Sequence, residues 1–332
     1  MNVIADEREV FAAMRRDLRD SQGRDYVTAR RQLRPLYGRV WMEIGAAYGV
    51  IVGVLAGLGA LDGPGTPWSS VIGFGLAGGL LIGYAINFLS LWFHEAAHFN
   101  IHRKKSWNDR LANVLLGPLV MQDIRHYRLV HFRHHGEYGE ITDPERSYFQ
   151  PLDLRFVAAS LLGIAALRTL RLRHSVPTPV GRWMPAVGSV LHGVVVVLGL
   201  LTAHFAVSLA WMFAIGAVFP FLGAVRQLLE HRQPDADDAA DYSRQPHGAY
   251  TRVFGDGPLA STLGGAGFNR HLIHHWDANL SSTRFREMER FLEDTALGDF
   301  YRGRKTTYGR TFRELFRPTL ARPRSARAQP GS

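Results

Sequence analysis

Histidines at short, regular spacings are the residues of this chain whose chemistry can be inferred first. His94 and His98 are four residues apart, and His102 follows at the same interval. Positions four apart lie on one face of an α-helix, so this spacing predicts three imidazoles that point the same way. The stretch also ends a long apolar run, and imidazole nitrogen is a common metal ligand. The pattern therefore predicts a metal site where a membrane-spanning helix meets water.

The motif H-x-x-H-H occurs twice further along the chain and adds to this expectation. Its residues, in chain order, are His131, His134, His135, His271, His274 and His275. His231 stands apart from the motifs, four residues after Gln227. One histidine on an apolar face is usually a structural residue, but three spaced groups favour metal binding. Eight or nine imidazoles are too many for one ion, since a zinc site takes four ligands, so the count predicts two metals.

The composition limits what kind of metal site is possible. The 332 residues include no cysteine, which excludes disulfides, thiolate ligands and cysteine nucleophiles. A metal must therefore be held by nitrogen or oxygen, and neutral imidazoles suit iron, copper, nickel or zinc. The formal net charge of +10 favours either nucleic acid or an anionic membrane face as a partner.

Four apolar segments are long enough to cross a bilayer, which takes about 20 helical residues. They run from Trp41 to Leu61, from Ser70 to Phe93, from Trp183 to Ala203 and from Phe205 to Leu229. The first two carry glycines at every fourth position, namely Gly45, Gly49, Gly53 and Gly57, then Gly75, Gly79 and Gly83. Glycine ridges let helices approach closely, so we expect these two segments to pack through their glycine faces.

The positions of the basic residues orient these segments. All 39 Lys and Arg residues lie before Trp41, between Phe93 and Trp183, or after Gly223. By the positive-inside rule, both termini and both long polar regions are expected to be cytoplasmic, at the plasma membrane if the protein is bacterial. Membrane orientation accounts for the charge, and no nucleic-acid-binding module is evident, so nucleic acid is not an expected partner.

The chain divides into a long membrane domain and an N-terminal segment. Residues 1–40 are polar, with Phe11, Met14 and Leu18 on one helical stripe. This stripe predicts a cytoplasmic amphipathic helix that lies on the membrane surface. Residues 41–316 then form the membrane domain that carries the histidine motifs.

Several stretches outside the spans have their own signatures. Leu111 to Met121 and Phe156 to Leu167 are apolar but too short to cross, so they are expected to lie in the interface or under the cytoplasmic domain. The polar segment from Arg232 to Pro258 is long for a loop, and predicts a cap, a docking surface or a plain connection. Residues 317–332 predict a disordered basic tail. The fold expected is an all-α integral membrane protein, with four transmembrane helices in two pairs and a cytoplasmic helical cap.

The order H-x-x-x-H, H-x-x-H-H, H-x-x-H-H across four spans closely resembles the membrane fatty acid desaturase and hydroxylase family. The similarity covers about residues 41–295, and Asp143-Pro144-Glu145 and the pair Glu230-His231 add to it. The resemblance implies two non-haem iron ions, with dioxygen as co-substrate. The ligands that it implies are His94, His98, His131, His134, His135, His271, His274 and His275, with His231 as a ninth.

The resemblance also implies a reaction, which is removal of hydrogen from an unactivated C–H bond of a lipid or fatty acyl chain. A second removal at the adjacent carbon gives a double bond, whereas rebound of oxygen gives an alcohol. Desaturation is the expectation, because the motifs look most like those of acyl desaturases, and a lipid or carotenoid hydroxylase or ketolase is the alternative. The chain has no His-Pro-Gly-Gly haem-binding motif, so a separate electron donor, a ferredoxin with its reductase, is expected.

Residues near the motifs give further expectations. Metal-bound imidazoles usually donate to a carboxylate or carbonyl group, and the carboxylates that are candidates for this role or for helix capping are Glu95, Asp143, Glu230 and Asp277. Asn87 and Ser90 lie on the helical face of His94 and His98, which predicts that this face turns inward toward a site or a tunnel mouth. Ordinary interhelical hydrogen bonding is the alternative. His102 and His126 flank the motifs but fall outside the family spacing. The histidines expected to be structural are His174, His192, His204 and His247.

Two other classes of protein are alternatives. The sequence His94-Glu95-Ala96-Ala97-His98 is also an H-E-x-x-H motif, which is typical of zinc metalloproteases. An intramembrane protease needs a third ligand, typically from a later Leu-Asp-Gly, but Leu61-Asp62-Gly63 precedes the motif and is expected on the opposite membrane face. A metal transporter keeps its ligands near the membrane midplane, whereas these gather at one boundary.

Overall fold

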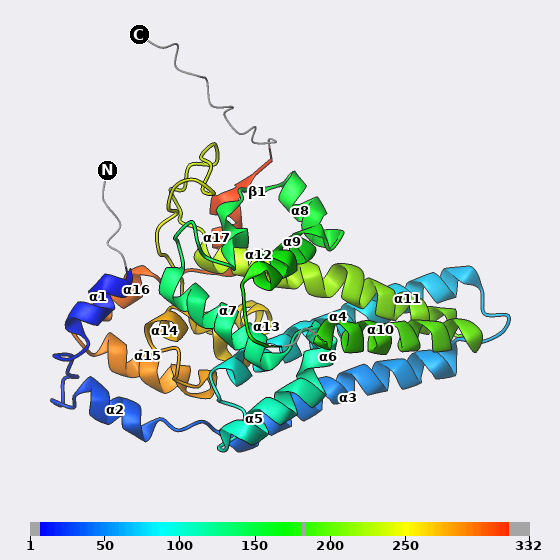
Figure 1. The fold of residues 1–332 in the computed structure, drawn as a ribbon, viewed down its shortest axis with the longest axis horizontal. Helices are drawn as coiled ribbons and strands as arrows, with labels where there is room; N and C mark the ends of the chain where they lie inside the picture. The colour runs from blue at the N-terminus through cyan, green and yellow to red at the C-terminus, as the bar shows by residue number, and fades with distance from the viewer. Residues whose placement is uncertain (1–6, 181–182, 319–332) are drawn as a thin grey trace, which may run out of the picture.

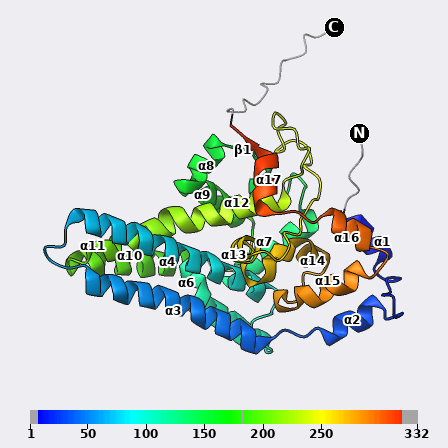
Figure 2. The same ribbon diagram turned by 180° about the vertical axis from the view of Figure 1, so that it is seen from behind.

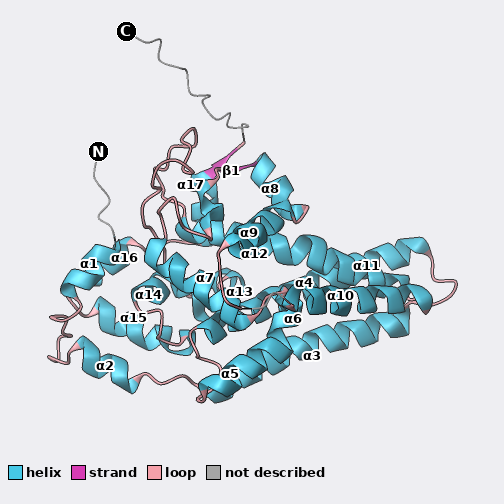
Figure 3. Cartoon of the chain, viewed as in Figure 1, coloured by secondary structure: helices cyan, strands magenta, loops and turns pink. Residues whose placement is uncertain are grey.

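Four long apolar helices lie side by side in the computed structural model, with many short helices gathered at one end (Figures 1 and 3). The structure describes residues 7–180 and 183–318. Within these ranges it has two short strands and is otherwise built of helices and loops, as predicted. The view from behind shows the same division into long and short helices (Figure 2).

The four long helices match the predicted spans to within a few residues. Their bounds are Tyr37–Leu61 (α3), Trp68–Ala97 (α4), Met184–Leu201 (α10) and Phe205–His231. The last consists of α11 (Phe205–Phe213), the π-helical turn η3 (Ala214–Val218) and α12 (Phe219–His231). All four are long and apolar enough to cross a membrane, which indicates an integral membrane protein.

Helix α4 packs against α3 on one side and against α11 and η3 on another. Its glycines Gly75, Gly79 and Gly83 face the fourth span. A Cβ atom at Gly83 would stand 2.5 Å from Cβ of Val218, and one at Gly79 would stand 2.8 Å from the carbonyl oxygen of Ala210. Only a residue without a side chain lets the two backbones come this close.

The predicted contact between the glycine faces of α3 and α4 is wrong. Apart from the adjacent residues and backbone of α3 itself, no atom of the described residues lies within 4 Å of a Cβ built at Gly45, Gly49, Gly53 or Gly57. Instead, α3 packs on α4 through larger side chains, since Val54 and Leu58 lie over Gly78. A four-residue spacing indicates a smooth helix face, but it does not say which neighbour covers that face.

The short helices form a cap at the end of the spans where α4 and α12 finish (Figure 1). Between α4 and α10 they are α5 (Lys105–Leu111), η1 (Ala112–Leu116), α6 (Gly117–Val120), α7 (Ile124–Glu137), η2 (Arg146–Phe149), α8 (Leu154–Leu161) and α9 (Ile164–Ser175). After α12 they are α13 (Pro258–Leu263), η4 (Gly265–Arg270), α14 (His271–Trp276), η5 (Ser282–Arg284), α15 (Phe285–Glu293), α16 (Gly298–Gly303) and α17 (Tyr308–Leu315). The N-terminal helices α1 (Glu7–Met14) and α2 (Tyr26–Gln32) complete the cap.

The other predicted segments are placed around this cap. The stretch from Leu111 to Met121 forms the end of α5, η1 and α6, and packs against α4 and α10. The stretch from Phe156 to Leu167 is divided between α8 and α9 by a left-handed turn at Gly163. The strand β1 (Leu152–Asp153) pairs in parallel with β2 (Phe316–Arg317). Of the predicted tail, residues 319–332 lie outside the described residues.

The apolar stripe of the N-terminal segment packs on protein, and its predicted place on the membrane surface is wrong. Phe11 and Leu18 are buried, and Met14 packs against the same cluster. The ring of Phe11 stacks on that of Trp276 in α14, with centroids 4.9 Å apart and planes 3° from parallel. A stripe of this kind indicates an apolar partner, and here the partner is the helix of the third histidine motif.

Glu7, in the first turn of α1, is fully buried and joins segments that are far apart in the sequence. Its carboxylate accepts hydrogen bonds from the hydroxyl of Tyr138 over 3.0 Å and from the hydroxyl of Thr251 over 2.6 Å. Arg304 lies 3.7 Å from the same carboxylate. One face of helix α1 is therefore fixed to the cap by Glu7.

Candidate metal centre

The first histidine motif lies where α4 ends. His94 is in the last turn of the helix, which stops at Ala97, and Phe99 then takes a left-handed backbone conformation with a φ of 60°. Arg128 holds this end by donating from Nε to the carbonyl oxygen of Ala97 over 2.7 Å. His98 follows as the cap residue, with its ring centroid 5.4 Å from that of His94.

The helix ends too early for His102 to share this face. The backbone N–H of Lys104 donates to Nδ1 of His102 over 3.0 Å, so this ring is turned back on its own loop. The predicted row of three imidazoles is therefore wrong in its third member, because helical spacing applies only while the helix continues.

The second motif lies on α7, which is fixed firmly at its N-terminus. The carboxylate of Asp123 caps the helix by accepting from the backbone N–H of Arg125 over 2.8 Å. Asn113 donates to the same carboxylate over 2.8 Å and so ties the cap to η1. The helix directs three histidines toward the end of α4, namely His131, His134 and His135.

The third motif lies on α14, which a sharp turn aims at the same place. Gly267 has a φ of 93°, which favours glycine, and a Cβ there would stand 2.7 Å from the carbonyl oxygen of Ser282. The helix that follows brings the ring of His274 to 4.5 Å from that of His94. Phe268 packs edge-on against His94, with centroids 4.7 Å apart, and so closes the apolar side of the centre.

The structure brings all nine predicted ligands together in two adjacent groups. The first group is His94, His98, His131, His135 and His274, whose ligand nitrogens lie within 4.8 Å of one another. The second group contains His134, His231 and His275 by the same measure. His271 joins it, because its Nε2 atom is 3.3 Å from that of His231 and 3.1 Å from that of His275.

Each H-x-x-H-H motif is divided between the two groups. In α7, His131 and His135 enter the first group and His134 enters the second. In α14, His274 enters the first group and the next residue, His275, enters the second. Neighbouring positions on a helix point in different directions, so one short helix can serve two sites. The rings of His135 and His275 link the groups, with centroids 4.7 Å apart.

The separations between imidazole nitrogens fit shared metal ions. The Nε2 atoms of His131 and His135 are 3.0 Å apart, and those of His271 and His275 are 3.1 Å apart. Two nitrogens that bind one ion at about 2.1 Å each lie about 3.0 Å apart when they subtend a right angle. Each group therefore contains a pair of nitrogens at a spacing that one shared metal ion would fit.

Buried nitrogen atoms without a hydrogen-bond partner give a second test of metal binding. Both ring nitrogens of His98 and both of His274 are buried in this way. Buried polar atoms are nearly always paired, so these atoms need a partner that a metal would supply. The ligand set contains nitrogen alone, which suits iron among other transition metals. The role of the nine histidines as ligands stays a prediction that this geometry supports.

Electrostatics keeps most of these imidazoles neutral. Burial, aided by neighbouring histidines and arginines, lowers the pKa well below its usual value in His131, His135, His271, His274 and His275. Burial likewise lowers the pKa of His98 to about 3, and Arg128 adds to the effect. Neutral imidazole is the form that binds metal, so these groups need not lose protons to do so.

His134 is the exception, because Asp143 acts on it directly. Burial alone would lower the pKa of His134, but the Asp143 carboxylate raises it above its ordinary value. Both carboxylate oxygens lie 2.9 Å from Nδ1 of His134, which leaves Nε2 for the second group. Tyr148 donates its hydroxyl to Asp143 over 2.6 Å, and the backbone N–H of Glu145 donates over 2.7 Å. The predicted contact of Asp143 with a histidine of the motifs is confirmed.

Glu145 and Arg173 are further parts of the centre that the sequence analysis did not assign. Oε2 of Glu145 lies 3.4 Å from Nδ1 of His131, and Oε1 lies 2.8 Å from Nη2 of Arg173. The signal for Glu145 was present in Asp143-Pro144-Glu145, which places two carboxylates after the second motif. Arg173, on α9, had no comparable signal, because only the fold brings α9 over the centre.

Of the other three candidate carboxylates, only Glu230 lies beside a histidine of the two groups. Oε2 of Glu230 lies 3.5 Å from Nδ1 of His271, as expected of a group that orients a ligand. Glu95 instead accepts from the backbone N–H of Ser282 over 2.9 Å, so its predicted contact with a ligand is wrong. Asp277 is also engaged elsewhere, since the hydroxyl of Tyr26 donates to it over 2.6 Å. Both of these carboxylates fix cap segments around α14.

The remaining histidines lie outside both groups. They are His102, His126, His174, His192, His204 and His247. His126 lies 2.8 Å from the hydroxyl of Thr178, and Trp211 donates to Nδ1 of His192 over 3.1 Å. These contacts are structural ones.

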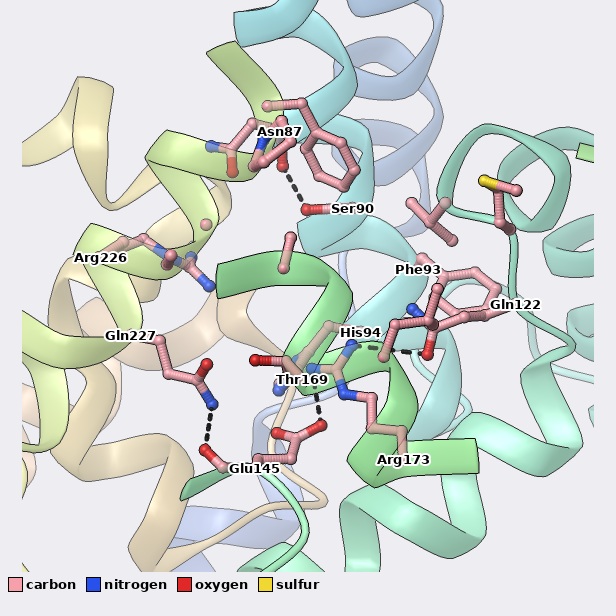
Figure 4. A pocket seen from close by; sticks show the side chains of 18 of the residues that line it. Asn87, Ser90, Phe93, His94, Gln122, Glu145, Thr169, Arg173, Arg226 and Gln227 are labelled. Carbon is pink, nitrogen blue, oxygen red and sulfur yellow. Dashed lines mark hydrogen bonds and ion pairs between the residues drawn. The ribbon is translucent and has the colours of Figure 1, made fainter. Parts of the chain in front are cut away.

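A cavity of about 390 Å³ opens beside the histidines, between α4, α6, α9, η3 and α12. Asn87 and Ser90 line it together with His94, so the predicted inward face of α4 is confirmed (Figure 4). The π-helical turn η3 supplies Ile215 and Gly216 to the opposite wall. Members of both histidine groups form the floor, namely His94, His131, His134, His231 and His271.

Comparison with known proteins gives one family match. A family model described as fatty acid desaturase matches residues 70–307, a range that includes all nine histidines of the two groups. A comparison with curated proteins finds no match.

Proposed function

The chain belongs to the fatty acid desaturase family, and on this premise we propose that it is an oxygen-dependent membrane desaturase of lipid acyl chains that uses two iron ions. The observation that carries the proposal is the convergence of nine histidines into two adjacent groups beside a cavity. Two groups of nitrogen ligands fit a pair of metal ions, and imidazole suits iron.

The proposed reaction removes two hydrogen atoms from neighbouring carbons of an acyl chain. It balances as R–CH2–CH2–R′ + O2 + two electrons + two protons, giving R–CH=CH–R′ + 2 H2O. The irons, when bound, supply the activation of dioxygen. The contribution of the protein is to hold a chain carbon close to both histidine groups and to keep bulk water away.

The residues of the cavity fit this division of roles. The walls carry apolar side chains such as Leu167, Ile215 and Phe219, which would enclose a hydrocarbon chain and exclude water. Asp143 and Glu145 approach the ligand histidines from outside the two groups and fix their orientation. Replacing a carboxylate in this position usually lowers metal affinity or activity 10- to 100-fold.

We further propose that the cap and both termini face the cytoplasm, on the basis of the Lys and Arg distribution in the sequence. In this orientation the bilayer delivers the lipid substrate through the spans. A soluble ferredoxin, kept reduced by its reductase, supplies the two electrons at the cap.

The two rival classes are not favoured by the geometry. The aspartate that a protease would need is Asp62, which comes before the first residue of α4. Its carboxylate accepts a hydrogen bond from the backbone N–H of Ala206 over 2.6 Å. It is thus separated from His94 by nearly the whole length of that helix. A transporter is disfavoured because the histidines gather at the end of the spans and not at their middle.

The test is a lipid comparison in aerated cells that express the protein together with a ferredoxin and its reductase. A mass loss of two hydrogens in one lipid class supports desaturation, and a gain of one oxygen assigns a hydroxylase of the same family. The matched control is His135→Ala in the same host, which should give neither product. Two tightly held irons in the purified protein support the proposal, whereas one zinc would support the protease and readily exchanged metal the transporter.

A further inference from the structure

We propose that the cavity beside the histidine groups recognises a neutral oxygen of its lipid, so that the substrate carries a carbonyl or hydroxyl group close to the carbon that is oxidised. A plain hydrocarbon segment, far from any polar group, is the alternative substrate. The inference rests on the proposed function for the oxidation itself, but the recognition of the oxygen can be tested without it.

Most polar groups that line the cavity are already paired within the protein. Gln227 donates from Nε2 to the carbonyl oxygen of Glu145 over 2.8 Å, and accepts from Ser147 over 2.6 Å. Ser90 donates to the carbonyl oxygen of Asn87 over 2.6 Å (Figure 4). These groups are therefore satisfied before any lipid enters.

Arg226 and Arg173 differ from these groups, because each has buried donors without a hydrogen-bond partner. In Arg226 these are Nε and Nη1, and in Arg173 it is Nε. The nearest carboxylate to Arg226 is Glu230, at 3.5 Å from Nε, which is too long for a good hydrogen bond. The two side chains approach the cavity from opposite sides, Arg226 from α12 and Arg173 from α9 (Figure 4).

A buried guanidinium whose N–H groups have no partner needs a hydrogen-bond acceptor. The side chain of Arg226 is only 16% exposed, so water has little access to it. Leaving a buried charged donor unpaired is costly, and charged residues within membrane segments usually serve a ligand. The open atoms of the two arginines are N–H donors, which fits the oxygen of a carbonyl, ester or hydroxyl group.

The charges in the cavity favour a neutral oxygen over a carboxylate or phosphate. Arg173 faces Glu145 at 2.8 Å, and Arg226 faces Glu230 at 3.5 Å, so each of the two guanidinium groups already has a carboxyl group beside it. A further buried anion would lie close to both carboxylates and lose its hydration as well. A neutral oxygen can accept hydrogen bonds from these unpaired N–H groups without this repulsion.

The same contacts place the oxygen near the reacting carbon. Glu230 lies 3.5 Å from Nε of Arg226 and also 3.5 Å from Nδ1 of His271. The guanidinium is therefore separated from a histidine of the second group by a single carboxylate. An oxygen bound by Arg226 would stand within a few carbon atoms of a chain position over the histidines.

The test measures binding of three probes of equal chain length to the bead-bound protein by scintillation proximity. The probes are tritiated methyl palmitate, palmitate and hexadecane, which present an ester, a carboxylate and no oxygen. We expect methyl palmitate to bind at least about 10-fold more tightly than hexadecane, as one hydrogen bond to a charged group predicts. Palmitate should bind less tightly than the ester. Equal binding of ester and alkane by the unchanged protein would overturn the proposal.

Variants connect the preference to the arginine. Arg226→Leu should reduce ester binding to the level of the alkane, and Arg226→Lys, which keeps one charged donor, should give an intermediate preference. The matched control is Arg171→Leu, an exposed arginine on α9 that does not line the cavity, and it should bind like the unchanged protein. Full ester preference in Arg226→Leu would refute the assignment. The assay needs no iron, oxygen or electron donor, so a failed turnover experiment leaves its result intact.

Discussion

Replacing Asp143 by asparagine tests whether the nine histidines form two separate metal sites. Asp143 holds Nδ1 of His134, which belongs to the second group only. The side chain is 1% exposed, so solvent does not screen its charge. A hydrogen bond to a charged group is worth about 1.5–3 kcal/mol, and loss of about 2 kcal/mol weakens metal binding about 30-fold. We expect one of the two irons to be lost on dialysis, while the other, in the first group, is retained.

The assay is iron titration of the purified protein, followed by elemental analysis after dialysis. Asp153→Asn is the matched control, because Asp153 is also a buried aspartate but caps α8 by accepting from the backbone N–H of Phe156 over 2.8 Å. Asparagine is an equally good cap, so this variant should keep both irons. If Asp143→Asn bound both irons as tightly as the unchanged protein, the role assigned to Asp143 would be refuted. Loss of both together would contradict the separation into two sites.

Other changes test the centre, the electron donor and the helix packing. His135→Ala should abolish turnover and reduce iron content, whereas His174→Ala should leave both unchanged, and a fully active His135→Ala protein would count heavily against the assignment. His231→Ala should lose the iron of the second group, as measured by elemental analysis, and retention of both irons would exclude it as a ligand. Turnover with ferredoxin should fall as salt is raised if basic residues steer an acidic donor, and a flat salt profile would remove that idea. Gly83→Ala should lower the free energy of unfolding by about 1–3 kcal/mol because its Cβ meets the fourth span, while Gly49→Ala should cost nothing, and equal thermal stabilities would contradict the packing.

The sequence was sufficient for features that depend on local periodicity or composition. The spans were located because an unbroken run of about 20 apolar residues is typical of a helix that crosses a membrane. The two-metal hypothesis followed from counting imidazoles, and the structure divides the same residues into two groups. His231 was found because it stands next to Glu230 at the end of a span, in the pattern of the family.

Features that depend on contacts between distant parts of the chain could not be predicted from the sequence. The glycine ridge of α4 and the stripe around Phe11 were both recognised as contact faces, but their partners were assigned wrongly. His102 was aligned with His94 on the assumption of a helix that continues, whereas the turn at Phe99 ends it. Arg173 lies between two spans in the sequence, and only the docking of α9 places it beside Glu145.

The contacts of the buried Glu7 carboxylate can form only in a certain order as the chain is synthesised. Its partners include Thr251 and Arg304, which the ribosome makes at least 244 residues later than the glutamate itself. These two contacts can therefore form only after all four long apolar helices have been synthesised. Only then can the first helix settle over the Trp276 ring and seal the outer side of the third histidine segment. A chain cut short before residue 304 would lack the Arg304 guanidinium beside this buried carboxylate.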